Sequence, residues 1–343
     1  MSLQLFASER FADHLTPPGH PERVERAAVM QVVASAFRKE GGVVVEPSAV
    51  AHEDLLRVHD AEYVALVAET AGRAVALDAD TYTSPLTYEV ACLAAGAAVN
   101  AVDQVLDSGP GARALALVRP PGHHAERNRA MGFCFFNNVA VAAAHARARG
   151  VDRVAIIDYD VHHGNGTQRR FYRDPSVLFI SSHQFPYYPG TGAADETGEA
   201  EGKGFTINLP FAAGAHDADY ELVYRTVVCP VVRQFRPALI LVSAGVDAHR
   251  DDPLGGMRLT SAEFGRLTAG IVSLADECCD GRVVAVSEGG YDLTAFADSM
   301  REVIQALAGE DHAGDVETPE GPAPRGNATL NAVRAHLSAS WQI

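Results

Sequence analysis

The sequence predicts an α/β fold in which one open, mostly parallel sheet is flanked by helices. Short apolar runs rich in Val, Ile and Leu alternate with longer amphipathic stretches along the chain. Most of the apolar runs show no polar alternation, which is typical of strands buried on both faces of a parallel sheet. Polar residues suited to catalysis follow several of these runs directly, where open α/β sheets hold their ligand sites.

Seven short apolar runs are expected to form strands, since each is bounded by turn residues or charges. In chain order they are Gly42–Val45, Ala114–Val118, Val154–Asp158, Val177–Ser181, Phe205–Leu209, Leu239–Ser243 and Val283–Ser287. Helices are expected before, between and after them at Pro21–Glu40, Leu86–Asp107, Asn137–Arg149, Ala218–Phe235, Ser261–Glu277, Leu293–Ala308 and Thr329–Ser338. This alternation predicts crossover connections and a parallel sheet.

Length and composition favour a single domain over residues 1–343. A chain of 343 residues, 47% of them hydrophobic, is long enough to bury one large core. No internal repeat or interdomain linker is found. The stretch Gln184–Gly204, rich in Pro, Gly, Tyr and Glu, is expected to be a surface loop. Residues Gly309–Gly326, rich in Pro, Gly and acidic residues, are interpreted as a mobile strap or a disordered tail.

Charge and cysteine content narrow the class of partner. The net charge of −16 argues against a nucleic-acid-binding surface, which would need basic clusters. It favours cationic substrates such as polyamines or lysine-rich tails, or serves solubility alone. Five cysteines without a CxxC pair indicate reduced thiols. We see no secretory segment and no apolar run near the ~18 residues that span a bilayer, so we expect a cytoplasmic protein without membrane attachment.

A metal site is predicted from three residues. Asp160 and His162 lie two positions apart just beyond the strand that ends at Asp158, so in extended chain they point to the same side. Asp247 follows the strand Leu239–Ser243 in the same way. Two carboxylates and one imidazole leave a position open for water, as in catalytic zinc sites, although Mn²⁺ or Fe²⁺ also suits such a set. Alone, the Asp-x-His pair would more simply be read as loop residues that cap the next helix.

Acid–base residues are predicted nearby. His123 and His124 follow a rigid Pro-Pro-Gly turn, and metal-assisted amide hydrolysis needs a base for the water and an acid for the amine. Asp158 and Asn165 are candidates to orient the two rings. Tyr291 follows two glycines and is suited to donate to an oxyanion, the alternative being a buried core tyrosine. Together these residues predict metal-assisted hydrolysis of an amide.

The motifs that carry these residues resemble the histone deacetylase superfamily, and more narrowly its class II-like bacterial amidohydrolases and acetylpolyamine amidohydrolases. They are Pro-Pro-Gly-His-His, Asp-Val-His-His-Gly-Asn-Gly-Thr and Glu-Gly-Gly-Tyr, within a resemblance that covers roughly residues 10–310. The helix entry Pro18–Arg23 and the loop Tyr188–Gly192 are also similar to family elements. The resemblance implies the arginase–deacetylase fold and one Zn²⁺ per chain, bound by Asp160, His162 and Asp247.

The resemblance also implies roles for the remaining polar residues. His124 would be the general base, held by Asn165, and His123 would assist electrostatically, held by Asp158. Tyr291 would stabilise the tetrahedral intermediate. An Asn at 165 is similar to class II members, whereas class I members usually carry Asp there. A Tyr at 291, where some weakly active class II members have His, indicates a competent enzyme.

A narrow substrate tunnel is implied as well. Its walls would be Gly132, Phe133 and Tyr188, around an acyl-lysine stem. Asp80 would hold the substrate backbone or amine at the rim. Arg23 would line an inner cavity that takes the released acetate.

The choice between an acetyl-lysine protein and a small acetylated amine stays open. Leu254 falls where the eukaryotic polyamine deacetylase carries a Glu gatekeeper, and its apolar character is similar to lysine deacetylases. No loop insertion of the kind that narrows the entrance of polyamine-specific dimers is identified. The oligomeric state, including a homo-oligomer, is therefore open too.

Potassium sites are a further implication of the resemblance. A first K⁺ would bind the side chains of Asp158 and Ser181 and the backbone carbonyls of Asp160, His162 and Ser182. A second would bind backbone carbonyls near Phe171, Asp174, Val177 and Phe205.

Two other functions compete with the deacetylase. An arginase-like ureohydrolase with two manganese ions would need an Asp two positions after His162, where this chain has Gly164. A non-catalytic module that binds acetyl-lysine is the other alternative. The complete set of predicted ligands, histidines and Tyr291 argues against it.

Overall fold

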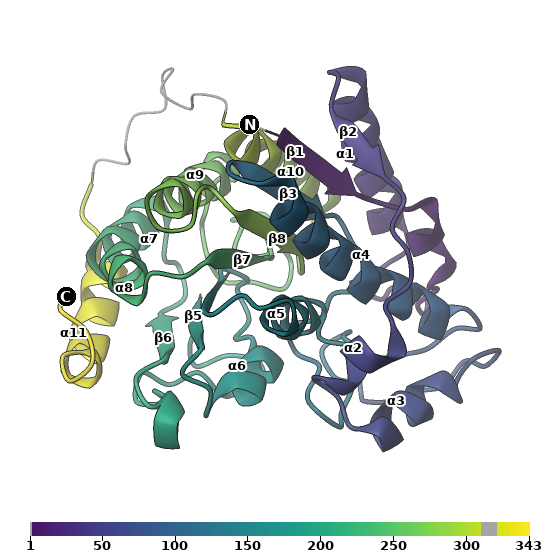
Figure 1. Cartoon of the computed structure of the whole chain (residues 1–343), viewed down its shortest axis with the longest axis horizontal. Helices are drawn as coiled ribbons and strands as arrows, with labels where there is room; N and C mark the ends of the chain where they lie inside the picture. Colours follow the sequence, from purple (N-terminus) through teal and green to yellow (C-terminus); the bar gives the residue numbers. More distant parts are fainter. Residues whose placement is uncertain (1, 310–320) are drawn as a thin grey trace.

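A computed structural model, which describes residues 2–309 and 321–343, contains one eight-stranded sheet in the order β2-β1-β3-β8-β7-β4-β5-β6 (Figure 1). The strands are β1 Ser2–Phe6, β2 Val43–Val45, β3 Ala112–Ala116, β4 Val154–Asp158, β5 Val177–Gln184, β6 Thr206–Phe211, β7 Leu239–Ala244 and β8 Val283–Ser287. Every pairing between these neighbours is parallel. The predicted open α/β sheet is confirmed.

Helices cover both faces of the sheet, and side chains that alternate along each strand feed two cores. The helices are α1 Glu25–Lys39, α2 His52–Leu56, α3 Ala61–Ala68, α4 Thr87–Ser108, α5 Asn138–Ala148, α6 Asn165–Phe171, α7 Asp217–Val223, α8 Cys229–Phe235, α9 Ser261–Cys278, α10 Leu293–Ala308 and α11 Pro324–Leu337. In β4, Ala155 and Ile157 join the core under α1 and α7–α11, whereas Val154 and Ile156 join the core under α3–α5. Burial on both faces explains why the strands lack polar alternation.

Some predicted elements differ from the structure. Strand β1 was not predicted, because its five residues alternate polar and apolar and gain strand partners only from β2 and β3. The single helix predicted over Ala218–Phe235 is divided by a π-helical turn at Tyr224–Val228. Pro230 lies in the first turn of α8, where its missing N–H is tolerated. The helix predicted from Pro21 begins at Glu25, and the short α2, α3 and α6 were missed.

The C-terminal part also differs from its prediction. The last helix begins at Pro324, so the end of the predicted strap at Gly309–Gly326 is helical. Residues 310–320 of that strap lie outside the described residues. The predicted loop over Gln184–Gly204 is mostly irregular, apart from the end of β5 and a short 3₁₀ turn at Ala200–Gly202.

One helix overturns an expectation about membranes. By length and composition, α4 passes the test for a bilayer-spanning helix, so the expectation that no such apolar run exists is wrong. Most of its apolar stretch is buried inside the fold, where it packs on β3 and α5.

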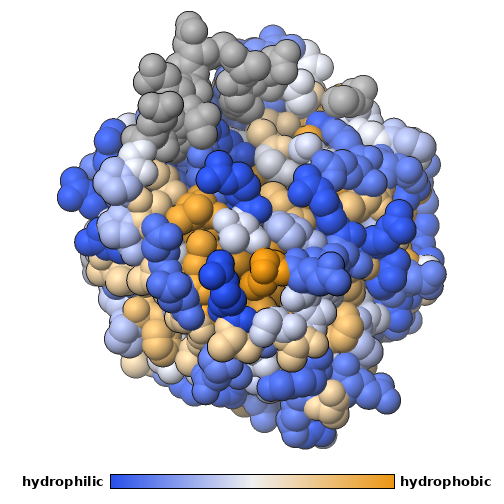
Figure 2. All heavy atoms as spheres, turned by 90° about the vertical axis from the view of Figure 1, so that its left-hand side faces the viewer, coloured by the Kyte–Doolittle hydropathy of each residue, from blue (hydrophilic) through white to orange (hydrophobic). Residues whose placement is uncertain are grey.

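On the face formed by α7, α8, α9 and α11, hydrophilic residues surround a small central group of apolar ones (Figure 2).

The order of the strands determines where the site lies. Strands β3, β8, β7, β4 and β5 are consecutive neighbours in the sheet, and parallel strands present their carboxyl ends at one edge. The loops that leave these strands carry the predicted catalytic motifs. Residues that are more than a hundred positions apart in sequence therefore meet at the same edge.

Candidate active site

Asp160, His162 and Asp247 come together in the interior, beyond the ends of β4 and β7. Their ligand atoms all lie within 4.8 Å of one another, and all three residues are buried. His162 Nδ1 lies 3.2 Å from Asp160 Oδ1 and 3.0 Å from Asp247 Oδ2. The N–H of Val161 donates to Asp247 Oδ1 at 2.7 Å, which leaves Oδ2 facing the imidazole. The structure thus assembles the predicted ligand set.

The chemistry of this set fits a divalent cation. Burial, and after it the nearby Asp160 carboxylate, raise the pKa of Asp247 to about 7. A cation between the two carboxylates would offset this repulsion. Glycines leave the space for it: a Cβ atom on Gly245 would overlap Asp160, and one on Gly289 would overlap Asp247. Two carboxylates and one imidazole suit zinc, and also Mn²⁺ or Fe²⁺.

The two histidines of the Pro-Pro-Gly-His-His turn have different partners. His123 Nδ1 lies 3.0 Å from Asp158 Oδ2, and His124 Nδ1 lies 2.8 Å from Asn165 Oδ1. Asn165 Nδ2 donates to Glu126 at 2.7 Å, so its amide oxygen faces His124 and accepts the ring N–H. The structure therefore contains both pairs that the sequence predicted.

The surroundings of the two rings shift their pKa values in opposite directions. Burial alone would lower the pKa of His123, but the carboxylates of Asp160 and Asp158 raise it to about 10. Burial and the positive charges of His123 and His162 hold the pKa of His124 well below its ordinary value. His123 is thus suited to carry charge, whereas His124 stays neutral, as a general base must be before it takes a proton. A divalent cation at the adjacent ligand set would favour the neutral form of both rings.

Two carboxylates that the sequence reading did not assign hold the catalytic loops in place. Glu288 accepts hydrogen bonds from the N–H groups of Gly122 at 2.6 Å and His123 at 3.1 Å. Asp252 accepts from the N–H of Tyr291 at 2.6 Å, and from Leu254 at 2.9 Å. In the sequence, Glu288 is a charged residue at the end of a buried strand and begins the Glu-Gly-Gly-Tyr motif, but neither feature shows its partners. Asp252 carries no such signal for its contact with the catalytic loop, because Tyr291 lies 39 residues away in the chain.

Tyr291 reaches the site from the start of the loop after β8. Its ring packs edge-on against Phe133 at 5.7 Å, and the Arg26 guanidinium lies over it at 5.1 Å. Burial raises the pKa of its hydroxyl well above the ordinary value, so this group stays a proton donor. Gly290 has φ +129°, a conformation that favours glycine and that turns the chain toward the pocket. Among the described residues, none forms a hydrogen bond with the Tyr291 hydroxyl.

A pocket of about 200 Å³ leads to these residues. It is lined by all five residues predicted to bind substrate and by four others: Asp80, His124, Gly132, Phe133, His162, Tyr187, Tyr188, Leu254 and Tyr291. Tyr188 packs edge-on against His124 at 5.2 Å. A Cβ atom on Gly132 would overlap His124, so a glycine is needed where the wall meets the histidine. The pocket is therefore narrow and has aromatic walls.

Tyr187 is a wall residue that the sequence reading missed. Its ring stacks on His162, with centroids 5.7 Å apart and an angle of 21° between the planes. Only its neighbour Tyr188 was predicted, because the resemblance that implied the tunnel walls gave no role to position 187. The bend in this Pro- and Gly-rich loop brings both rings to the pocket.

Arg23 is placed differently from its prediction. It is exposed and lines a surface pocket of about 540 Å³ rather than an inner cavity. The arginine buried behind the site is Arg26, which donates to the carbonyls of Gly290 at 2.8 Å and Glu288 at 2.7 Å. The positions differ because Arg23 precedes α1, whereas Arg26 lies in its first turn and faces inward.

The residues predicted to bind potassium are neighbours in the fold. Asp158 and Ser181 lie opposite each other in the register of β4 and β5, and Ser182 Oγ donates to the Asp158 carbonyl at 3.2 Å. The second set lies where the end of α6 meets the starts of β5 and β6, namely Phe171, Asp174, Val177 and Phe205. Both potassium sites stay predictions.

Comparison with known proteins agrees with this geometry. The family model described as histone deacetylase domain matches residues 18–307. A protein of Archaeoglobus fulgidus named "Probable deacetylase" is 40% identical over 88% of this chain and 85% of its own length. Human "Polyamine deacetylase HDAC10" is 41% identical over 84% of this chain, which spans 44% of that protein.

The fold is also found in a solved structure. The crystal structure of the HDA15 HD domain superposes with a TM-score of 0.92 and 36% identity, over 99% of this chain and 95% of that one. The match includes the parallel sheet and the helices on both of its faces. The chain therefore belongs to the histone deacetylase family and has the arginase–deacetylase fold.

Proposed function

We propose that this protein is a zinc-dependent deacetylase that hydrolyses N-acetyl amides of cationic amines or lysine side chains to the free amine and acetate. One observation carries the proposal: a histidine of the metal-ligating group, a second histidine and a tyrosine line one narrow pocket, namely His162, His124 and Tyr291. The other two ligating groups and the second histidine of the pair lie directly against these rings. We further propose that residues 1–343 act as a single catalytic domain in the cytoplasm.

Asp160, His162 and Asp247 would hold one divalent ion, with zinc favoured over Fe²⁺ or Mn²⁺. The ion would supply Lewis-acid activation of water and of the amide carbonyl. A second ion, as in an arginase-like ureohydrolase, would need another acidic ligand two residues after His162. The residue there is Gly164, which supports a single ion.

His124 is suited to act as the general base. Asn165 accepts its Nδ1–H, so Nε2 carries the lone pair that can take a proton from the attacking water. The water oxygen then bonds to the carbonyl carbon of the acetyl group. The C–N bond breaks as the departing nitrogen takes the proton from the histidine pair, which releases the amine and acetate.

His123 and Tyr291 would stabilise the charge that develops during this step. The Asp158 carboxylate keeps His123 oriented and would stabilise positive charge on its ring. The Tyr291 hydroxyl would donate to the developing oxyanion, and its raised pKa keeps the proton in place. Leu254 and the aromatic walls, Phe133 and Tyr188, favour a linear aliphatic stem.

Acetylpolyamine hydrolysis is the second candidate, since a relative at 41% identity is named for it and the chain has a net charge of −16. Asp80 at the pocket would pair with a substrate amine in either case. We therefore compare rates on an acetyl-lysine peptide, N-acetylputrescine and N8-acetylspermidine, with a chelator control for each substrate. Chelator-sensitive acetate release supports the proposal, and the preferred substrate selects between the candidates. Absence of release from all three by metal-loaded protein would contradict both.

A further inference from the structure

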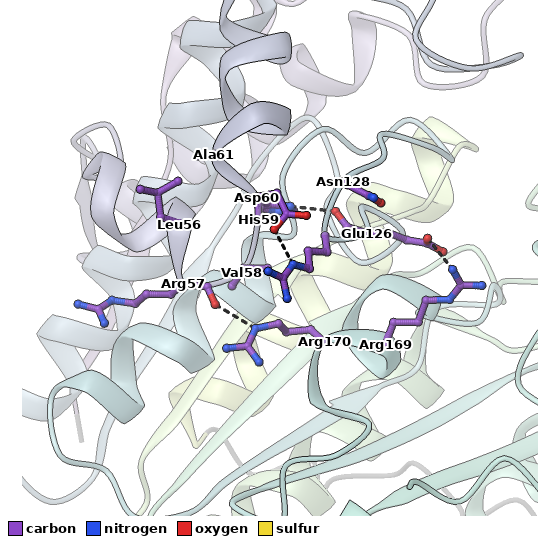
Figure 3. A pocket seen from close by; sticks show the side chains of 11 residues that line it. Leu56, Arg57, Val58, His59, Asp60, Ala61, Glu126, Asn128, Arg169 and Arg170 are labelled. Carbon is purple, nitrogen blue, oxygen red and sulfur yellow. Dashed lines mark hydrogen bonds and ion pairs between the residues drawn. The ribbon is translucent and has the colours of Figure 1, made fainter.

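A second pocket, of about 620 Å³, lies outside the catalytic centre (Figure 3). Three segments line it: the chain from the end of α2 to the start of α3, the chain just after the His-His turn, and two arginines of α6. The lining residues are Leu56, Arg57, Val58, His59, Asp60, Ala61, Glu126, Arg127, Asn128, Arg169 and Arg170. None of the predicted catalytic, metal or substrate residues lines it.

Buried hydrogen bonds fix the shape of this pocket. The N–H of Asn137 donates to His59 Nε2 at 3.0 Å, so Nδ1 carries the ring proton and donates to the Glu126 carbonyl at 2.9 Å. The N–H of Asp60 donates to the Arg127 carbonyl at 2.9 Å. The two loops are thus joined to each other by hydrogen bonds from His59 and Asp60.

Four arginines face this pocket, in a chain whose net charge is −16. Three of them pair with carboxylates: Arg57 with Asp54 at 3.0 Å, Arg127 with Asp60 at 2.6 Å, and Arg169 with Glu126 at 2.7 Å. Arg170 differs, because its Nε donates to the Arg57 carbonyl at 3.0 Å. Within the described part of the chain, no carboxylate lies at ion-pair distance from Arg170.

The charge of Arg170 is therefore only partly compensated. Burial lowers its pKa, Asp174 counteracts this from a distance, and the positive charge of Arg127 lowers it again. Figure 3 shows Arg170 and Arg57 on one side of the pocket, while Arg169 on the other side reaches Glu126. An anion beside Arg170 and Arg127 would stabilise both charges.

Guanidinium groups favour one class of anion. Their planar donors match two oxygens of a phosphate, and two neighbouring groups match a doubly charged ligand. All four arginines line one pocket, whereas nucleic-acid surfaces carry their basic residues along a stripe or patch, and this favours a small ligand. A volume of this size accepts a small metabolite.

We propose that this pocket binds a small molecule through its phosphate or diphosphate group, with Arg170 and Arg127 as the main contacts. The site lies apart from the metal centre and does not depend on the deacetylase proposal. Its nearest link to that centre is Glu126, which accepts from both Arg169 and Asn165. Tests that separate the two sites must therefore leave Glu126 and Arg169 unchanged.

Isothermal titration of the metal-loaded protein with inorganic phosphate, pyrophosphate and a nucleoside diphosphate tests the site. We expect saturable binding of pyrophosphate that weakens about tenfold or more in R170Q, because charge-assisted bonds are lost. R170K keeps the charge and should bind better than R170Q. The matched control R301Q removes an exposed arginine on α10 and should bind like the wild type. Tighter binding of the nucleoside diphosphate than of pyrophosphate would identify a nucleotide as the ligand class.

Two outcomes would overturn this site. One is that the wild type shows no saturable binding up to millimolar ligand concentrations. Circular dichroism checks that R170Q and R301Q are folded. The other is binding that survives R170Q and R127Q but is lost in D247A, which would place the anion on the metal. This second result leaves the deacetylase proposal intact, so the failures of the two proposals are distinguishable.

Discussion

The closed end of the substrate pocket and its mouth differ in how firmly they are held. Behind the closed end, Asp160, His123 and Asp247 are buried, and backbone N–H groups of neighbouring loops donate to both carboxylates. At the mouth, Tyr187 and Tyr188 are 39% and 37% exposed and belong to a loop rich in proline and glycine. The comparison teaches that the sheet positions the chemistry, whereas loops form the part of the pocket that selects the substrate.

Removing a ligand at the closed end should have the largest effect. D247A is expected to abolish metal binding and acetate release, because only two ligands would remain. Metal content by mass spectrometry and acetate release are the readouts. D251A, an exposed aspartate in the same loop, is the matched control and should resemble the wild type. Full metal occupancy in D247A would remove Asp247 from the ligand set.

The next largest effect is expected where the closed end meets the substrate carbonyl. Y291F should lower kcat by about 10²–10³-fold, or roughly 3–4 kcal/mol of transition-state stabilisation, because an oxyanion donor is lost. KM and bound metal should stay close to the wild-type values, since the ring keeps its contacts with Phe133 and Arg26. An unchanged kcat would show that Tyr291 takes no part in the reaction.

Acidic pH should lower the free energy of unfolding through a buried histidine rather than through residues at the pocket mouth. Burial lowers the pKa of His59 from 6.5 to about 4, so between those values the unfolded chain binds more protons at this site than the folded protein. The free energy of unfolding should fall by up to about 1.4 kcal/mol per pH unit for this residue as pH drops through that window. H59Q should show a shallower loss in urea unfolding, whereas the exposed control H336Q should not. Equal slopes in H59Q and the wild type would refute this account of His59.

The smallest effect is expected at the mouth itself. L254E places a carboxylate beside the pocket, where it would favour a substrate with a second ammonium group. The ratio of kcat/KM for N8-acetylspermidine to that for an acetyl-lysine peptide should rise by about tenfold, the effect of 1.4 kcal/mol. L66E, on the exposed face of α3, is the control for added charge. An unchanged ratio would remove Leu254 from substrate selection.

The difference between buried strands and loops also explains which features could be predicted from the sequence. Central strands such as β4 and β7 are short apolar runs without polar alternation, and the ligands follow them within a few residues, so strand and ligand were found together. Strand β1 is half polar and depends on its two neighbours for its structure. The π-helical turn at Tyr224–Val228 likewise has no signal in an amphipathic pattern.

Residues that act through backbone contacts were the hardest to predict. Glu288 stands inside a recognised motif, but the sequence does not show that it accepts from the N–H groups of Gly122 and His123. Asp252 and Glu126 escaped notice for the same reason, because their partners are distant in the chain. Arg23 and Arg26 are three positions apart, and only the observed start of α1 shows which side chain faces inward.

The most direct test of the account is a zinc titration of metal-free protein that follows bound zinc by native mass spectrometry and acetate release in the same samples. We predict that one zinc ion binds per chain, and that acetate release rises in proportion to the zinc occupancy until this site is full. Acetate release from metal-free protein would contradict it, as would activity that appears only after a second ion has bound.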